Sequence, residues 1–471
     1  MNSLFVAESL APVYEIPSSV RVKRHGDQYI VVNPDTGGWA VADRQEVAAL
    51  LYPAARPRRL AEEAYYWGIA RRNGHYAVPH FDYRAPAMFM FEFNLTWGCN
   101  LACVYCSNDG GPRYAHVRAG PGVVSAFARR VVEYAVAMGQ RSVTVEFTGG
   151  EPFLNFPAMR QTMEELTRLS PPGLAVEWLV QSNFTAVTDE ALAFLRPFDA
   201  SLGISWDGLP AVQDSQRRFA DGRGSYDAVV DGVGRARRAG FEIRSAYCVV
   251  TSESIDLMPE LAQFFLDNGM AHLVFEPVRP LGRGGSRNGL VPDARHYAEN
   301  LLTTFERVFV PHYRRTGVMP IERHALLTFA HLMEPARRFM CAQAPCGAGR
   351  LISVTMPDGA VYPCNEMFWP DHLRLGNVLD NSFTEMVASE PARRLSERTP
   401  DKIEECRDCL YRGWCHSRCA RGALARGNLF SRSLYCDVEK ALLDEFLGAI
   451  VDGRCDLEAA RVLARKVVTC V

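Results

Sequence analysis

Cysteine is the residue type whose spacing in this chain could do chemistry. Cys99, Cys103 and Cys106 stand in a C-x3-C-x2-C pattern on what reads as one short loop. Three thiolates so close together can bind three irons of a [4Fe–4S] cube, which leaves the fourth iron without a protein ligand. An open iron can coordinate a small molecule, as a catalytic zinc with an open position does. The alternatives are a zinc site lacking one ligand, or three cysteines grouped by chance.

A second group of eight cysteines lies in the C-terminal part of the chain. Eight thiolates are enough for two fully ligated [4Fe–4S] clusters. Four thiolates in a tetrahedron suit zinc equally well. The four cysteines from Cys406 to Cys419 could therefore make a zinc site by themselves. We expect the remaining Cys248, Cys455 and Cys470 to be small buried hydrophobic residues. The group of eight comprises Cys341, Cys346, Cys364, Cys406, Cys409, Cys415, Cys419 and Cys436.

The composition is that of an ordinary globular chain with balanced charge. Its 471 residues include 52 lysines and arginines against 54 acidic residues, and 48% are hydrophobic. A net charge of −2 gives no bulk attraction to nucleic acid or anionic lipid. No apolar run approaches the ~20 residues of a membrane helix, and the first residues do not resemble a signal peptide. We therefore expect a cytoplasmic protein, where clustered cysteines more often bind metal than form disulfides.

Alternating β-prone and helical segments are the elements that must position these cysteines. Apolar β-prone runs occur at 89–95, 142–147, 175–180, 201–204, 242–250 and 272–276. Segments with helical periodicity follow most of them, at 124–138, 157–169, 189–195, 226–239, 256–268 and 297–308. Six such repeats predict an α/β fold with a parallel sheet, open or partly closed into a barrel. Reactive groups in such sheets lie on the loops after the strands, where both 99–106 and 149–152 fall.

The chain divides into four expected parts. Residues 1–85 form a small α+β domain, with strands at 20–23 and 28–32, helices near 44–51 and 60–69, and a linker around Pro79 and Pro86. Residues 86–330 form the parallel core. Residues 331–440 are rich in cysteine, glycine and proline, as is typical of a metal-stapled region with little core of its own. Residues 441–471 return to a helical pattern.

The loop 279–287 places Arg279, Arg283 and Arg287 among glycines. A basic loop of this kind could contact nucleic acid, but the balanced charge of the chain favours a solvated loop at the barrel mouth. The loop contains no G-K-[ST] sequence, so a phosphate-binding loop is excluded.

The three-cysteine loop and its surroundings resemble the radical S-adenosylmethionine (SAM) superfamily, whose signature carries an aromatic residue before the last cysteine. That residue is Tyr105 here. The stretch Gly149-Gly-Glu-Pro152, after the second predicted strand, is similar to the family's GGEP motif. Its glycines, Gly149 and Gly150, allow close backbone approach, and Glu151 offers an acceptor to the methionine amino group. The resemblance implies a partial six-repeat barrel that binds SAM and one [4Fe–4S] cluster.

Further residues carry the resemblance along the barrel. Asn183, and Ser205 with Asp207, occupy places where the family contacts the methionine and ribose groups. The segment 207–227 resembles a family stretch written DG…HDxxR…GSFD, which implies that Arg217 pairs with the SAM carboxylate. The sequence departs from that pattern at Gln213, where a histidine is usual.

The eight-cysteine region resembles a SPASM domain, a region named for peptide- and sulfatase-modifying enzymes. The resemblance implies two auxiliary [4Fe–4S] clusters whose ligands interleave along the chain. Set I, the ligands of the first cluster, comprises Cys341, Cys346, Cys364 and Cys419. Set II, the ligands of the second cluster, comprises Cys406, Cys409, Cys415 and Cys436.

The resemblance implies hydrogen abstraction by a 5′-deoxyadenosyl radical, with the auxiliary clusters accepting an electron. Sulfatase maturases carry a catalytic aspartate after the cysteine that matches Cys364. Asn365 stands there instead, with Glu366 the nearest acidic alternative. We therefore expect a ribosomal-peptide maturase that makes an oxidative crosslink, either C–C or thioether, and draws electrons from a donor such as flavodoxin or ferredoxin. Residues 1–85 resemble a winged-helix domain and would bind the leader segment of the precursor peptide.

Four other interpretations stay open at this point. They are sulfatase-maturase-like oxidation of a protein side chain, epimerisation of a peptide, a radical enzyme that modifies RNA, and a binding module that is held together by zinc and is not an enzyme. The eight-cysteine region favours a polypeptide substrate over RNA.

Overall fold

The computed structural model describes residues 12–52, 56–77, 88–286, 289–334, 339–368 and 370–466. One sheet of ten strands, in the order β12-β11-β10-β9-β8-β7-β6-β13-β14-β15, runs through the molecule. Its middle six strands, β6 to β11, are parallel neighbours in chain order, as the six repeats predict. These strands are β6 (Met90–Asn94), β7 (Ser142–Thr148), β8 (Ala175–Ser182), β9 (Ser201–Ser205), β10 (Ser245–Val250) and β11 (His272–Pro277).

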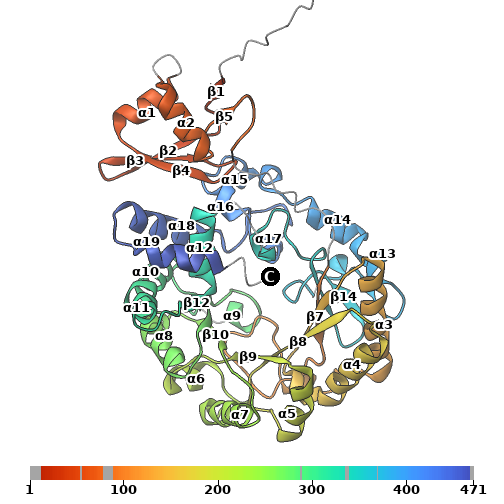
Figure 1. Ribbon diagram of the computed structural model, residues 1–471. Helices are drawn as coiled ribbons and strands as arrows, with labels where there is room; N and C mark the ends of the chain where they lie inside the picture. The colour runs from red at the N-terminus through yellow and green to blue at the C-terminus, as the bar shows by residue number, and fades with distance from the viewer. Residues whose placement is uncertain are drawn as a thin grey trace, which may run out of the picture.

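Helices cover the outer side of this sheet and leave its inner side facing a central space, so the sheet curves into a partial barrel (Figure 1). The prediction of an α/β partial barrel is thereby confirmed. A short helix after β9, α6, was not predicted. The outer helices are α3 (Pro121–Ala137), α4 (Phe156–Leu169), α5 (Asp189–Leu195), α6 (Pro210–Gln216), α7 (Tyr226–Arg238), α8 (Met258–Asp267), α10 (Ala294–Thr304) and α11 (Val310–Thr316), whereas the short α9 (Gly282–Ser286) lies on the inner side (Figure 1).

Alternation along the strands decides which side chains face the helices and which face the barrel interior. On β7, Val143, Val145 and Phe147 belong to the main hydrophobic core. The residues between them point the other way, and Glu146 and Thr148 line the central cavity. Strand β6 repeats the pattern with Glu92 and Asn94 on the cavity side. Polar residues at alternate positions therefore build the inner wall.

The N-terminal part is a separate small α+β unit. Its antiparallel sheet has the order β2-β3-β4, followed by α1 (Arg44–Leu51) and α2 (Arg58–Tyr66). The sequence predicts two strands here, and β4 (Gly38–Ala42) is a third that was missed. The expected linker around Pro79 and Pro86 and the boundary at 85 lie outside the described residues. The other strands are β1 (Tyr14–Glu15), β2 (Arg21–His25), β3 (Gln28–Asn33) and β5 (Arg71–Arg72), of which β1 and β5 pair.

The central sheet continues across the expected boundary at 330. Strand β13 (Ile352–Thr355) pairs in parallel with β6, so the cysteine-rich region is hydrogen-bonded to the barrel. Local periodicity did not reveal this pairing. Strands β12 (Ile321–Glu322), β14 (Ala360–Tyr362) and β15 (Gly376–Asn377) complete the sheet, and short helices follow: α13 (Phe383–Val387), α14 (Glu390–Ser396), α15 (Glu404–Arg407), α16 (Arg412–Cys415) and α17 (Ala420–Leu424).

The chain ends in two helices rather than in one helical stretch. Helix α18 (Cys436–Val451) packs against α10, and α19 (Leu457–Arg465) packs against α12 (Arg323–Met333). The N-terminal unit lies beside α15 and α16 (Figure 1). The indole Nε1 of fully buried Trp414, on α16, donates to the Gly37 carbonyl at 2.7 Å. Along the described residues, no helix combines the length and apolarity needed to span a bilayer.

Candidate functional site

One cavity of about 650 Å³ opens inside the barrel, and most of the predicted site residues line it. It brings the three-cysteine loop and all four cysteines of set I to the walls of one space. None of the set II cysteines lines it. Pro152 and Asp207 are also absent from its walls. The predicted residues that line it are Cys99, Cys103, Tyr105, Cys106, Gly149, Gly150, Glu151, Asn183, Ser205, Arg217, Cys341, Cys346, Cys364, Glu366 and Cys419.

Backbone packs directly on backbone where the Gly149–Pro152 turn meets the three-cysteine loop. A Cβ on Gly150 would lie 2.2 Å from the Gly98 carbonyl oxygen, and Gly149 adopts a φ of +139°. The Gly150 amide donates to the Thr96 carbonyl at 2.7 Å, and the Glu151 amide donates to the Gly98 carbonyl at 2.9 Å. Only glycine permits this approach, which fixes the start of the cysteine loop.

A second set of contacts holds the cysteine loop. The Arg283 guanidinium donates to the Cys103 carbonyl at 2.8 Å and to the Gly110 carbonyl at 2.7 Å, and it pairs with Asp109 at 3.0 Å. The expectation of a solvated loop at 279–287 is therefore wrong for Arg279 and Arg283, whereas Pro280, Gly282, Gly285 and Ser286 are exposed. Arg279 and Arg283 are largely buried and hold the site, whereas Arg287 lies outside the described residues. The charge balance of the whole chain carried no information about these local contacts.

Glu151 has an environment suited to a cationic group. Its side chain is 1% exposed and accepts hydrogen bonds from the Ser182 hydroxyl at 2.8 Å and from the backbone amides of Asn183 (2.9 Å) and Phe153 (3.1 Å). Burial raises the pKa of Glu151 to about 7 in spite of these bonds. No described residue pairs a positive charge with it. A ligand ammonium in the cavity would supply the missing charge.

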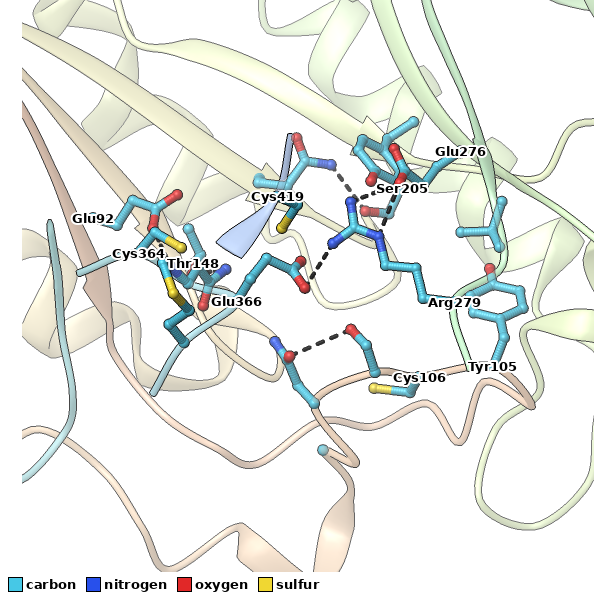
Figure 2. A pocket seen from close by; sticks show the side chains of 18 of the residues that line it. Glu92, Tyr105, Cys106, Thr148, Ser205, Glu276, Arg279, Cys364, Glu366 and Cys419 are labelled. Atoms are coloured by element: carbon cyan, nitrogen blue, oxygen red, sulfur yellow. Dashed lines mark hydrogen bonds and ion pairs between the residues drawn. The ribbon is translucent and has the colours of Figure 1, made fainter. Parts of the chain in front are cut away.

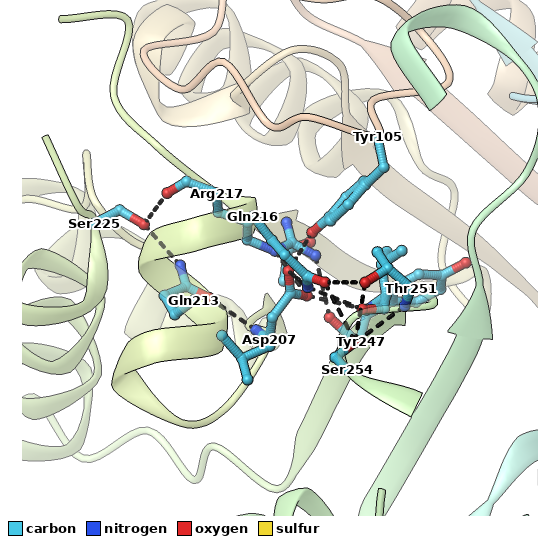
Figure 3. Close-up of polar contacts among 12 residues, drawn as sticks. Tyr105, Asp207, Gln213, Gln216, Arg217, Ser225, Tyr247, Thr251 and Ser254 are labelled. Carbon is cyan, nitrogen blue, oxygen red and sulfur yellow. Dashed lines mark hydrogen bonds and ion pairs between the residues drawn. The ribbon is translucent and has the colours of Figure 1, made fainter. Parts of the chain in front are cut away.

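Asp207 is the centre of a buried polar network rather than part of the cavity wall (Figure 3). Its carboxylate is 0% exposed, accepts from the Tyr105 hydroxyl at 2.5 Å and pairs with the Arg217 Nε at 3.0 Å. Further donors are the Gln216 side chain at 2.9 Å and the Val249 amide at 3.0 Å. Asp207 is thus connected to the cavity through partners that line it, namely Tyr105, Arg217 and Val249.

Gln213, the departure from the family pattern, takes part in the same network. Its side-chain oxygen accepts from the Asp207 amide at 2.8 Å, and its side-chain nitrogen donates to the Ser225 hydroxyl at 2.7 Å (Figure 3). An amide supplies one acceptor and one donor, as a neutral histidine does. The substitution therefore keeps the turn after β9 joined to the start of α7.

Arg279 links the barrel to the cysteine-rich region across the cavity (Figure 2). Its guanidinium pairs with Glu276 at 2.6 Å and with Glu366 at 2.6 Å, and it lies over the Tyr435 ring at 5.2 Å from the centroid. The neighbouring Arg323 also pairs with Glu276. These cations lower the pKa of Glu276 in spite of its burial. Glu366 is thus placed in the cavity, but its carboxylate is held by a cation.

Two carboxylates that the sequence analysis missed stand on the inner wall. Glu92 and Glu146 are directly opposite each other on β6 and β7. Glu92 accepts from the Asn365 amide at 3.0 Å, and burial together with its acidic neighbours raises its pKa well above the usual range. Burial raises the pKa of Glu146 to about 7, and no described residue donates a hydrogen bond to it. Alternation along the strands could have revealed both residues.

The remaining cysteines behave as their sequence context indicates. Cys248 and Cys455 are buried in the main core, as expected, and Cys470 lies outside the described residues. The set II cysteines are partly buried. Among the described residues no three histidine, cysteine or acidic side chains converge closely enough to hold a single metal ion. A cube is wider than one ion, and its thiolates stand further apart.

The wall residues fit the groups that the sequence implies. Three partly buried thiols stand on one loop beside glycine backbone, and soft thiolates are the ligands that iron–sulfur clusters use. Glu151 offers a buried carboxylate without a cation, and Ser205 and Asn183 place polar groups along the same wall. The four set I cysteines line the same space.

Two family models match the chain. Residues 93–265 match the radical SAM superfamily, and residues 346–410 match the iron–sulfur cluster-binding domain called SPASM. The chain therefore contains a radical SAM domain followed by a SPASM domain. Its radical SAM domain binds SAM and a [4Fe–4S] cluster, and its SPASM domain binds auxiliary iron–sulfur clusters.

Named relatives fall in two groups. The mycofactocin maturase MftC of Mycolicibacterium smegmatis is 28% identical over 73% of this chain and 80% of its own length. A cysteine-type anaerobic sulfatase-maturating enzyme of Clostridium novyi is 21% identical over 74% of this chain and 92% of its own length. Neither identity assigns a substrate to this chain.

Solved structures share the fold. The structure of native anSMEcpe with bound AdoMet and the Cp18Cys peptide superposes with a TM-score of 0.67 at 20% identity, covering 78% of this chain and 99% of that one. The structure of Streptococcus suis SuiB bound to precursor peptide SuiA superposes with a TM-score of 0.52 at 13% identity. The match covers 90% of this chain and 100% of that one. Both likenesses concern the fold.

The packing of Gly150 on Gly98 generates a first prediction. In Gly150→Ala the new Cβ must push the cysteine loop away, so the iron content should fall from about twelve to about eight per chain. SAM cleavage should fall at least about 100-fold, because misplacement by an ångström has that effect. Iron analysis and chromatography of 5′-deoxyadenosine measure both. The matched control is Gly122→Ala on α3, where a Cβ meets nothing. Native iron content in Gly150→Ala would contradict the prediction.

Proposed function

We propose that this enzyme is a peptide maturase that forms an oxidative intramolecular crosslink, either C–C or thioether, in a ribosomally made precursor peptide. One observation carries the proposal: the three-cysteine loop and the four set I cysteines line the same cavity. A substrate carbon inside it is reachable from both sides. Hydrogen removal on one side and electron acceptance on the other make a net two-electron oxidation.

The proposed ligands follow from the sequence and from their places in the cavity. Cys99, Cys103 and Cys106 hold the open cluster, and sets I and II each hold one auxiliary cluster. Glu151 binds the SAM amino group and Arg217 its carboxylate, with Asn183 and Ser205 along the same wall. Bound SAM supplies a 5′-deoxyadenosyl radical that can take a hydrogen from an unactivated carbon. The chain itself orients the peptide and excludes water.

The N-terminal unit is the proposed holder of the precursor's leader. Its antiparallel sheet exposes Val22 and Val41, and Trp414 anchors it to the cysteine-rich region. The proposed division places this unit at 1–85, the radical SAM core at 86–330, the auxiliary-cluster region at 331–440 and a helical segment at 441–471. A one-electron donor such as flavodoxin or ferredoxin is the proposed source of electrons.

Glu146 is the proposed proton acceptor. An oxidised substrate must lose a proton as well as an electron, and the Asn365 amide is no base. The Glu366 carboxylate already pairs with Arg279 at 2.6 Å. Glu146 faces the cavity without a hydrogen-bond donor among the described residues, and burial raises its pKa to about 7. A carboxylate of that pKa takes up protons near neutral pH.

Sulfatase-maturase-like oxidation is the second candidate, because relatives carry that name. Asn365 argues against it, since the family's aspartate is missing there. Epimerisation of the peptide can be distinguished from the proposed crosslink because it leaves the mass of the peptide unchanged.

A second prediction concerns the product. Anaerobic turnover with a short peptide encoded beside this gene should lower the peptide mass by about two hydrogens, because a crosslink removes one hydrogen from each joined atom. High-resolution mass spectrometry with fragmentation locates the bond, and Cys99→Ala serves as the inactive control. An unchanged mass with deuterium taken up from solvent would contradict the crosslink and indicate epimerisation.

A third prediction concerns the proton acceptor. Glu146 accepts a proton only when ionised, so peptide modification should rise with pH through about 7. Glu146→Gln should abolish that rise and slow modification about 100-fold or more, while 5′-deoxyadenosine still forms. Rates from pH 5.5 to 8.5 test this. The matched control is Glu177→Gln, an exposed carboxylate on β8 that does not line the cavity. Crosslinking by Glu146→Gln at the native rate would exclude the role.

A further inference from the structure

Arg398, just after α14, is a buried cation without a carboxylate partner. Its side chain is 1% exposed, among the largest fully buried side chains of the described residues. No Asp or Glu within the described ranges forms an ion pair with it. Burying a charge is costly unless hydrogen bonds and opposite charge compensate it. Something else in its surroundings must therefore balance the guanidinium.

Hydrogen bonds to backbone supply the first compensation. The guanidinium donates to the carbonyls of Leu429 (2.7 Å), Ser417 (3.0 Å), Arg418 (3.0 Å) and Ser431 (3.2 Å), and to the Ser417 hydroxyl (3.2 Å). These acceptors belong to two segments of the cysteine-rich region. One lies between Cys415 and Cys419, and the other leads to Cys436. Arg398 therefore ties three proposed cluster ligands together.

The segment between Cys415 and Cys419 has a backbone that needs such support. Its residues His416, Ser417 and Arg418 have φ values of +51°, +61° and +42°. Three consecutive non-glycine residues in the left-handed region are unfavourable and persist only where the surroundings hold them. The run turns the chain so that the cysteine at one end belongs to set II and the cysteine at the other to set I.

Negative charge supplies the second compensation. Burial lowers the pKa of Arg398, and the groups that act against this are the sulfurs of Cys346, Cys419, Cys406 and Cys415. Two of these belong to each set. The cation also contacts the segment that joins Cys415 of set II to Cys419 of set I, so thiolate charge from both sets is the counter-charge available to it.

We propose that Arg398 is a positioning residue shared by the two auxiliary cluster sites, which holds the left-handed turn between Cys415 and Cys419 and electrostatically favours the reduced state of both clusters. The proposal rests on the proposed ligand sets. A fixed positive charge nearby stabilises the form with one more electron, and surrounding charge is one of the influences that set cluster potentials. Arg398 thereby adjusts how readily the auxiliary sites accept the substrate's electron.

The experiment measures potentials rather than peptide modification. Cys99, Cys103 and Cys106 are replaced by alanine in the full-length chain, which should leave about eight irons, all auxiliary. Reduction potentials are then measured by redox titration followed by electron paramagnetic resonance. They are compared between the protein that keeps Arg398 and its Arg398→Gln and Arg398→Lys variants. At a fixed applied potential, Arg398→Gln should show a tenfold lower ratio of reduced to oxidised cluster. For a one-electron couple this corresponds to a reduction potential lower by about 59 mV.

Arg398→Lys separates charge from shape, because it keeps the positive charge and loses the fork of donors. It should keep a potential near the native one while losing part of its iron. Arg393→Gln, an exposed arginine on α14, is the matched control and should change neither. Native reduction potentials in Arg398→Gln would overturn the proposal. It would also be overturned if Arg398→Gln and Arg398→Lys lost equal amounts of iron while the clusters that remain in both variants kept native potentials. Zinc instead of iron in the alanine background would refute the proposed cluster sets themselves.

Discussion

The contact between Gly150 and Gly98 is the constraint on which the rest of the site depends. A Cβ at Gly150 would come within 2.2 Å of the Gly98 oxygen, so two loops after neighbouring strands share one backbone surface. The Arg283 guanidinium donates to the Cys103 carbonyl of the same loop, and the Tyr105 hydroxyl attaches the loop to Asp207. A loop held by these three contacts keeps its thiols in place without relying on the cluster alone. Preorganisation of this kind lets a site bind a reactive group without reordering.

The barrel wall connects this loop to the cysteine-rich region. Alternation on β6 and β7 sends apolar side chains into the helix layer and sends Glu92, Asn94, Glu146 and Thr148 into the cavity. Strand β13 extends the same sheet, so the set I cysteines reach the opposite wall through hydrogen-bonded structure. The Arg279–Glu366 pair spans the space between the two regions. The two halves of the proposed chemistry are thus parts of one rigid framework rather than of two loosely joined domains.

Much of the fold could be predicted from the sequence, because the barrel depends on local patterns. All six parallel strands occur where β-prone runs predict them, and α1 and α5 have the predicted bounds. The cysteines and the glycine turn were found for a similar reason, since their chemistry depends on spacing along the chain. Contacts between distant segments were not predictable in this way. The pairing of β13 with β6, the cation of Arg283 against the Cys103 carbonyl and the internal position of Asp207 all depend on tertiary packing, which leaves no periodicity in the sequence.

The central claim is that eleven cysteines hold three clusters around a framework that the barrel has already formed. Counting iron and labile sulfide in anaerobically reconstituted protein tests it most directly. The account predicts about twelve irons and twelve sulfides per chain. Replacing Cys99, Cys103 and Cys106 together should remove about four of the irons and four of the sulfides. A content near four would remove the auxiliary clusters and with them the proposed electron acceptor. Stoichiometric zinc without iron would contradict the account entirely.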